Sequence, residues 1–197
     1  MSASRVFLAA ADNLRLVGSG AYPAAVDAAI DLLYSAVSAG GKLLVCGNGG
    51  SAADAEHLAA ELVGRFGVEP RRPMPAIALT ANTAFLTAWS NDTTFDDVFA
   101  RQVDALARPG DVVLGISTSG NSPNVVHALR RARALGVATI GLTGRAGGLL
   151  APHCDVLMAA PLDDTPRIQE IHLVTYHAIC AALERRLSQS ASEKRPD

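Results

Sequence analysis

Aromatic side chains and net charge are both scarce in this chain of 197 residues. Phe, Tyr and Trp make up 5% of it, and 17 basic side chains nearly balance 19 acidic ones, for a formal net charge of −2. A nucleic-acid groove needs a basic stripe and aromatic platforms on which bases stack. The composition therefore argues against nucleic acid as a ligand, and it predicts that any bound phosphate is held largely by uncharged groups.

Cysteines and long apolar runs are also lacking. Cys46, Cys154 and Cys180 are widely spaced and form no CxxC pair, which argues against a disulfide framework or a cysteine-based zinc site. No run reaches the ~18 consecutive apolar residues of a membrane span. Residues 1–5 lack the start of a signal peptide. We therefore expect a cytoplasmic protein with no membrane partner.

Short apolar runs that alternate with helical stretches dominate the rest of the chain. Runs that are apolar throughout are typical of strands in a parallel sheet covered on both faces. We predict one α/β domain, residues 1–187, with a doubly wound five-stranded parallel sheet. The predicted strands are 42–46, 76–80, 111–117, 138–142 and 155–159, and the helices between them are 51–66, 95–107 and 123–135.

Helical segments are predicted at both ends of this domain. Residues 1–40 form a helical extension with helices at 6–17 and 23–39, and a last amphipathic helix runs over about 165–187. The polar tail 188–197 is predicted to be disordered. An extension of this kind leaves an apolar side uncovered, so we expect helices that pack between subunits.

A glycine-rich loop follows the first predicted strand and opens a helix. In residues 47–51, Gly-Asn-Gly-Gly-Ser, glycines allow a close backbone approach, and the helix start offers unpaired N–H groups to an anion. The loop also matches a dinucleotide fingerprint, but that site needs a carboxylate at the end of the second strand, where Leu79 to Asn82 supply none. A plain tight turn is the remaining alternative.

A hydroxyl-rich loop follows the third predicted strand. Residues 117–122, Ser-Thr-Ser-Gly-Asn-Ser, hold four hydroxyls before a helix with Pro123 in its first turn. Ser122 alone could be an N-cap, but capping does not need four hydroxyls. Loops after adjacent parallel strands meet at the switch point of an open sheet, where ligands bind. A phosphomonoester is the ligand that both loops predict.

Candidate acid–base and metal-binding side chains lie on two predicted helices. His57 and Glu61 are four residues apart and share one helix face, which a solvated ion pair would also explain. On the last helix, Gln169 and His177 are about 12 Å apart along the axis and about 80° around it. One ion could reach both only if their side chains splay or if two chains contribute.

These segments together resemble the phosphoheptose isomerases of the sugar isomerase (SIS) superfamily. The similarity covers roughly residues 12–187, and it depends on the combination of motifs, which lie at 46–61 (CGNGGSAADAEHLAAE), 86–92, 117–122 (STSGNS), 142–144 and 167–172 (RIQEIH). The family implies a flavodoxin-like sandwich, a homotetramer with sites between subunits, and interconversion of sedoheptulose 7-phosphate and D-glycero-D-manno-heptose 7-phosphate. It also implies a place in ADP-heptose synthesis, as for lipopolysaccharide.

The resemblance also implies site residues. It assigns one zinc ion per subunit, with ligands His57, Glu61, Gln169 and His177. The implied substrate contacts are Asn48, Gly49, Gly50, Glu61, Asn91, Asp92, Ser117, Thr118, Ser119, Ser122 and Gln169, with Ser51 close by. Trp89-Ser90 departs from the smaller residues usual in the family, and 83–85 has no clear counterpart, so the shape of the sugar pocket stays open.

The chemistry of such a reaction suits two of these residues. Moving a carbonyl from C2 to C1 requires removal of a proton, an enediolate, and return of a proton to the neighbouring carbon. A carboxylate and an imidazole suit these transfers, and we predict that Glu61 performs one and His177 the other. The alternatives are a non-catalytic relative that binds the replication initiator DnaA and a sugar-phosphate-sensing regulatory domain.

Overall fold

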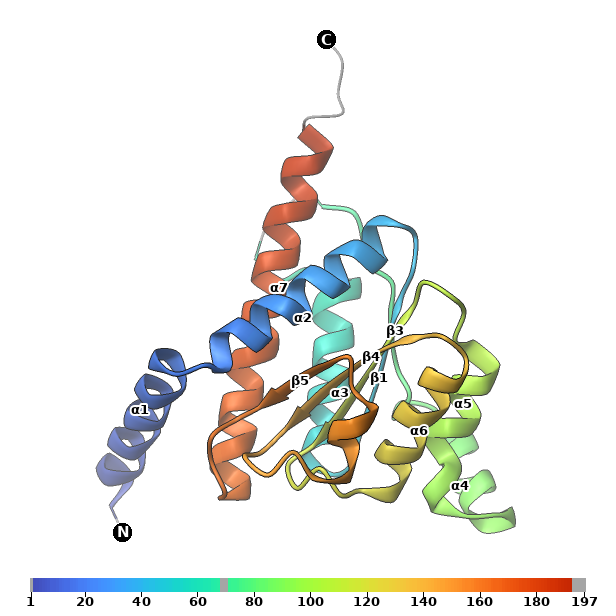
Figure 1. The fold of residues 1–197 in the computed structure, drawn as a ribbon, viewed down its shortest axis with the longest axis horizontal. Coiled ribbons are helices and arrows are strands. Elements are labelled where there is room, and N and C mark those ends of the chain that lie inside the picture. The colour runs from blue at the N-terminus through green and yellow to red at the C-terminus, as the bar shows by residue number, and fades with distance from the viewer. Residues whose placement is uncertain (1, 68–70, 193–197) are drawn as a thin grey trace.

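The computed structural model describes residues 2–67 and 71–192, and in this part of the chain five parallel strands form one sheet. The strand order is β2-β1-β3-β4-β5, which confirms the predicted doubly wound α/β fold (Figure 1). The strands are β1 (Leu43–Gly47), β2 (Ala76–Ala78), β3 (Val112–Ser117), β4 (Ala138–Thr143) and β5 (Val156–Ala159). In this order the chain reverses direction across the sheet between β1 and β3, so the loops after these two strands meet.

Helices cover both faces of the sheet. They are α1 (Ala3–Ser19), α2 (Tyr22–Ser38), α3 (Gly50–Val63), α4 (Thr83–Asp92), α5 (Val98–Leu106), α6 (Pro123–Ala134) and α7 (Thr165–Ser192), with short 3₁₀ turns η1 (Phe95–Asp97) and η2 (Gly148–His153). Helices α2, α3 and α7 lie on one face, and α5 and α6 lie on the other (Figure 1). Helix α1 projects from this body and buries only Val17.

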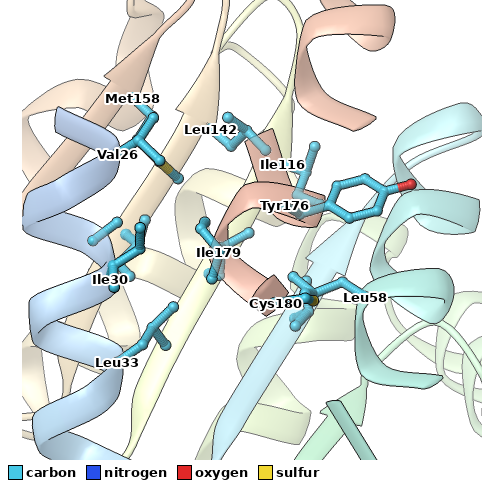
Figure 2. Packing of buried hydrophobic residues seen from close by; sticks show 14 of the residues in the cluster. Val26, Ile30, Leu33, Leu58, Ile116, Leu142, Met158, Tyr176, Ile179 and Cys180 are labelled. Carbon is cyan, nitrogen blue, oxygen red and sulfur yellow. The ribbon is translucent and has the colours of Figure 1, made fainter. Parts of the chain in front are cut away.

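The larger hydrophobic cluster lies between the sheet and helices α2, α3 and α7. Its side chains come from the sheet and from all three helices. Ile30 lies on α2, Leu58 on α3, Ile116 on β3 and Ile179 on α7 (Figure 2). Each of these side chains is at most 5% exposed. Burial of one such side chain stabilises the fold by about 1.5–3 kcal/mol, so this cluster fixes α7 against α3 and the sheet.

The sheet is buried at its centre and open at one edge. Strands β1 and β3 are buried along their whole length, as the apolar runs predict. Strand β2 is only partly buried and ends two residues earlier than predicted. The ladder still continues for one bond, because the Leu79 amide donates to the Val45 carbonyl at 2.8 Å. The chain then turns to enter α4.

Helix α4 is an element that the sequence did not predict. None of its residues is buried, so it lacks the apolar stripe from which a helix is recognised. Its start is nevertheless encoded, since the Asn82 side chain accepts from the Phe85 amide at 3.0 Å. Further on, the predicted helix 95–107 is divided into η1 and α5, where the Thr94 hydroxyl accepts from the Asp96 amide.

The last helix is longer than predicted. Helix α7 continues through Ser192, so the structure describes residues 188–192 of the predicted disordered tail as helical. The rest of the predicted tail, 193–197, lies outside the described residues. No single helix in the described part is long and apolar enough to cross a membrane; α1 and α2 pass that test only as a pair, bent by 70°.

Candidate functional site

The two predicted loops meet at the switch point between β1 and β3. The glycine-rich loop follows β1 and leads into α3, and the hydroxyl-rich loop follows β3 and leads into α6. Between them lies a cavity of ≈ 230 Å³. The residues that line it are Asn48, Ser51, Ile116, Ser117, Thr118, Ser119, Ser122, Thr165 and Gln169. Seven of the predicted substrate-binding residues are thus brought together by the fold of one chain.

The lining of this cavity is polar and carries no charged side chain. Ser117 and Ser122 lie with their hydroxyl oxygens 3.0 Å apart, so Ser122 turns toward the cavity. It makes no side-chain cap on α6, and the start of α3 has none either. Helix starts without such caps leave N–H groups and a positive dipole end for an anion. The arrangement can therefore bind a phosphate without a cation, as the composition predicts.

Two polar residues of this region were missed by the sequence analysis. Asn124 is 1% exposed and exchanges two side-chain hydrogen bonds with Asn48, at 2.8 and 2.9 Å, which join the glycine loop to α6. Thr165 lines the cavity because α7 begins there, so a third helix start meets the other two. The one signal for Asn124 in the sequence was that a polar residue directly follows Ser122-Pro123.

Helices α3 and α7 lie side by side and run in the same direction from this cavity (Figure 1). Gln169 packs against Gly50 at the start of α3, where an added Cβ would come within 2.4 Å of the Gln169 amide nitrogen. Further along, Tyr176 contacts His57, and Glu184 reaches the end of α3. We call the line of contact between the two helices the α3–α7 seam.

Three of the predicted acid–base and metal-binding residues meet in the middle of this seam. His57 Nε2 lies 3.1 Å from Glu61 Oε1, and the two side chains are 41% and 25% exposed. The ring centroids of His57 and His177 are 5.2 Å apart. His177 Nε2 is buried and has no hydrogen-bond partner among the described residues. The solvated-pair alternative therefore describes His57 and Glu61 incompletely, because a second imidazole borders them.

A buried ion pair holds the far end of the seam. The Arg71 guanidinium donates to the Glu184 carboxylate, and both side chains are at most 3% exposed. Arg71 also donates to the backbone carbonyls of Glu61 and Leu62. Glu184 in turn accepts from the Phe66 amide at 2.7 Å. Charged pairs of this kind need such additional hydrogen bonds to repay desolvation, and here those bonds fix the last turn of α3, which carries Glu61.

The four residues that the resemblance assigns to zinc do not converge in one chain. Gln169 lies at the cavity end of the seam, and His177 lies about 12 Å further along α7. Within residues 2–67 and 71–192, no three His, Cys, Asp or Glu side chains gather closely enough to hold a metal ion. In donor type His57, Glu61 and His177 fit zinc, and the unpartnered His177 nitrogen fits a ligand. The described chain alone holds an incomplete set.

The predicted substrate contacts at Asn91 and Asp92 lie apart from the cavity. They end α4, are exposed, and contact each other, with the Asn91 amide donating to Asp92 Oδ1 at 2.9 Å. Helix α4 packs beside η1 and α5, on the other side of the sheet from the seam (Figure 1). Gly49 lies in the glycine-rich loop and Gly50 begins α3, and neither of them lines the cavity.

The cysteine thiols take no part in this site. Cys46, Cys154 and Cys180 are unpaired, and Cys46 and Cys180 are buried. Burial raises the pKa of each of the three thiols to about 12, so they remain protonated near neutral pH and are poor nucleophiles. The thiols therefore offer no nucleophile beside the carboxylate and imidazole groups of the site.

Comparisons with known proteins agree with this geometry. A family model described as the SIS domain matches residues 8–144. A phosphoheptose isomerase of Geotalea daltonii is 59% identical over 82% of this chain and 84% of its own length. Solved phosphoheptose isomerases from Neisseria gonorrhoeae and Francisella tularensis superpose with TM-scores of 0.85 and 0.88, at 41% and 36% identity, and each alignment covers 92% of this chain and 96% of the other.

Fold, switch-point cavity and family model together define a SIS-domain protein. The identities and coverage above place it more narrowly. The chain belongs to the phosphoheptose isomerase family, whose members are aldose–ketose isomerases.

Proposed function

We propose that this protein converts sedoheptulose 7-phosphate to D-glycero-D-manno-heptose 7-phosphate. One observation carries the proposal: an uncharged, hydroxyl-lined cavity lies at the foot of a seam that holds Glu61 and His177. The phosphate would bind in the cavity, and the sugar would extend along α3 toward these two side chains. The relatives named as phosphoheptose isomerases support this choice of substrate.

Glu61 and His177 would carry the two proton transfers. One removes a proton from C1 of the ketose, which gives the enediolate, and the other returns a proton to C2. The hydroxyl proton on O1 passes to O2 in the same conversion, so that the carbonyl moves to C1. Each such transfer contributes roughly 10²- to 10⁴-fold to the rate. Arg71 supports Glu61 by fixing the backbone that carries it.

We further propose one zinc ion per subunit, held by His57, Glu61, His177 and Gln169. Bound there, a metal ion would act as a Lewis acid that polarises the substrate oxygens. The donor types and the unpartnered nitrogen of His177 support the site. Because Gln169 lies at the cavity end of the seam in one chain, side-chain movement or a second chain has to complete the set.

A homotetramer with sites between subunits is the proposed assembly. Large apolar side chains are exposed on the two helices that flank the body, namely Phe7, Leu8, Leu14 and Leu16 on α1 and Leu173 and Val174 on α7. A second subunit would cover them and would bring Asn91 and Asp92 to a neighbouring cavity. Light scattering coupled to size exclusion tests this: a monomer at micromolar concentration would contradict it.

The product would supply ADP-heptose or related heptose building blocks, and the cytoplasmic location stays a prediction. The comparisons favour the enzyme over a DnaA-binding protein and over a sugar-phosphate sensor. The deciding experiment is an assay of the wild-type protein on sedoheptulose 7-phosphate, with zinc and with a chelator. Turnover that the chelator removes supports both proposals. Turnover that resists the chelator contradicts the metal, and no turnover under either condition contradicts the isomerase.

A further inference from the structure

Tyr176 lies between two residues of α3, although its ring belongs to the hydrophobic core. The ring packs in the cluster under α7, and its hydroxyl points toward α3 (Figure 2). The hydroxyl donates to Asp54 Oδ1 at 3.3 Å and lies 3.0 Å from His57 Nδ1. The His57 and Tyr176 rings meet edge to face, with centroids 5.4 Å apart. A carboxylate, a phenol and an imidazole thus form one chain of hydrogen bonds.

The direction of these bonds follows from the number of hydrogens. The Tyr176 hydroxyl has one hydrogen, which Asp54 receives. Toward His57 the same oxygen is an acceptor, so Nδ1 of His57 has to carry the hydrogen. In a neutral imidazole the other nitrogen is then an acceptor. That nitrogen, Nε2, faces Glu61 Oε1 across 3.1 Å, so these two acceptors can lie this close only with a cation between them, either a proton or a metal ion.

A stabilising role in the fold does not explain the position of the Asp54 carboxylate. Its Oδ2 atom is buried and has no hydrogen-bond partner among the described residues. Burial raises the pKa of this carboxyl, and the bond from Tyr176 lowers it in part. A buried oxygen left without a hydrogen-bond partner destabilises the folded state. Its retention beside His57 is explained if Asp54 orients its neighbours rather than stabilising the fold.

We propose that Tyr176 and Asp54 are positioning residues that hold His57 with Nδ1 protonated, so that Nε2 directs its electron pair toward a cation beside Glu61. Outer partners of this kind orient imidazole ligands and raise their basicity in metal sites. The link to metal affinity rests on the zinc site proposed above. The tautomer itself does not, and it can be measured without metal or substrate.

The test uses ¹⁵N-labelled, metal-free protein, in which two-bond ¹H–¹⁵N spectra show which ring nitrogen of His57 carries hydrogen. The wild type is expected to show hydrogen on Nδ1, with any second hydrogen on Nε2 shared with Glu61. Tyr176→Phe removes the acceptor, so His57 is expected to move its hydrogen at least partly to Nε2, where Glu61 accepts it. Hydrogen on Nε2 alone in the wild type, or the same hydrogen positions in the wild type and Tyr176→Phe, would overturn the proposal.

Tyr22→Phe is a matched control. It removes another buried tyrosine hydroxyl that bonds to α7, at Thr175 Oγ1 over 2.9 Å, and it touches none of the predicted ligands. Zinc titration by calorimetry should show an affinity about 10- to 100-fold lower in Tyr176→Phe than in Tyr22→Phe. Equal losses of zinc affinity and of thermal stability in the two variants would mean that Tyr176 has a structural role only.

Asp54 provides a second, independent arm. In Asp54→Leu the Tyr176 hydroxyl is free to donate to His57 Nδ1, so the tautomer is expected to invert although the tyrosine remains. Asp54→Asn keeps an acceptor oxygen and is expected to preserve the wild-type tautomer. The same tautomer in Asp54→Leu and in the wild type would contradict the proposed relay. Failure of the isomerase assay alone would leave these spectra unaffected, so the two proposals fail separately.

Discussion

The switch-point cavity and the α3–α7 seam are neighbouring parts of one site, yet they differ in how completely a single chain builds them. The cavity has its wall of hydroxyls and its paired Asn48 and Asn124 in place. The seam brings His57, Glu61 and His177 together but leaves Gln169 at its cavity end. On the proposed function, one chain builds the phosphate-binding part of the site, whereas the proposed acid–base and metal part needs side-chain movement or a second chain.

This difference has a physical origin. The cavity is assembled from backbone and short side chains at the ends of buried strands, which the sheet register fixes. The seam is assembled from long side chains whose exposure reaches 41%. Such side chains gain their final geometry from a ligand or a neighbouring subunit. Variants in the seam should therefore alter turnover, and variants in the cavity should alter binding or folding of the chain.

The largest effect is expected for Glu61→Gln. The amide cannot accept the proton, so turnover should fall by roughly 10²- to 10⁴-fold, while the fold and the cavity remain intact. Steady-state assays measure the first effect, and circular dichroism with a thermal melt checks the second. Full activity in this variant would remove Glu61 from the mechanism.

A pH dependence of stability is expected where the seam meets the sheet. Burial lowers the pKa of His172 from 6.5 to about 4, although its Nε2 bonds to the Thr143 carbonyl. The folded state therefore disfavours protonation of this ring. The contribution of His172 to the free energy of unfolding is complete above pH 6.5. It is lost as the pH falls toward 4, by about 3 kcal/mol at ~1.4 kcal/mol per pH unit.

Urea denaturation of the wild type and of His172→Phe between pH 7 and pH 4 measures this contribution. The variant should lose less stability over that range, because its side chain at 172 does not titrate. Parallel losses in the two proteins would show that His172 contributes nothing to the acid sensitivity.

A smaller difference in stability is expected between alanine substitutions at two glycines with positive φ. Gly120 in the hydroxyl loop has φ +68°, and an added Cβ would lie 2.0 Å from the Gly147 carbonyl oxygen. Gly110 has φ +93° with open space around it. Gly110→Ala should cost about 1–2 kcal/mol from its backbone conformation alone, and Gly120→Ala should cost more because backbone must move. Equal free energies of unfolding would contradict a rigid cavity wall.

The smallest effect is expected for Ser122→Ala in the cavity. Three other hydroxyls of the same loop line the cavity, so loss of the Ser122 donor should be worth about 1.5 kcal/mol, the low end for a hydrogen bond to a charged group. KM should then rise about 12-fold while kcat stays nearly constant, since the phosphate is bound alike before and during reaction. Ser19→Ala, at an exposed helix end, is the control. A fall in kcat without a change in KM would place Ser122 in the chemical step instead.

The sequence predicted the cavity better than the seam. Glycines and hydroxyls follow directly on apolar strands, and the parallel topology alone brings such loops together, so Asn48, Ser117 and Ser122 could be found. Thr165 could not, because its place depends on where α7 begins. Residues 193–197 lie outside the described part, and the roles assigned to Asn91 and Asp92 stay predictions.

Tyr176 and Asp54 show why seam contacts escaped prediction. They are 122 positions apart, and nothing in periodicity gives the register of one helix against another. Helix α4 was missed for a related reason, since it buries none of its side chains and so carries no helical stripe. Local patterns thus predict which elements form, whereas contacts between distant elements require the packed core.

Because α3 and α7 run in parallel from the cavity, the distance from the cavity to the proposed acid–base residues is fixed by the fold. With a rise of ~1.5 Å per residue, α3 places His57 about 9 Å and Glu61 about 15 Å beyond Ser51 along its axis. A sugar whose phosphate binds in the cavity would have to span that fixed distance for its carbonyl to reach these residues. A chain with fewer carbons would bind by its phosphate and leave its carbonyl short of the acid–base pair, so selection among sugar phosphates would be made by length.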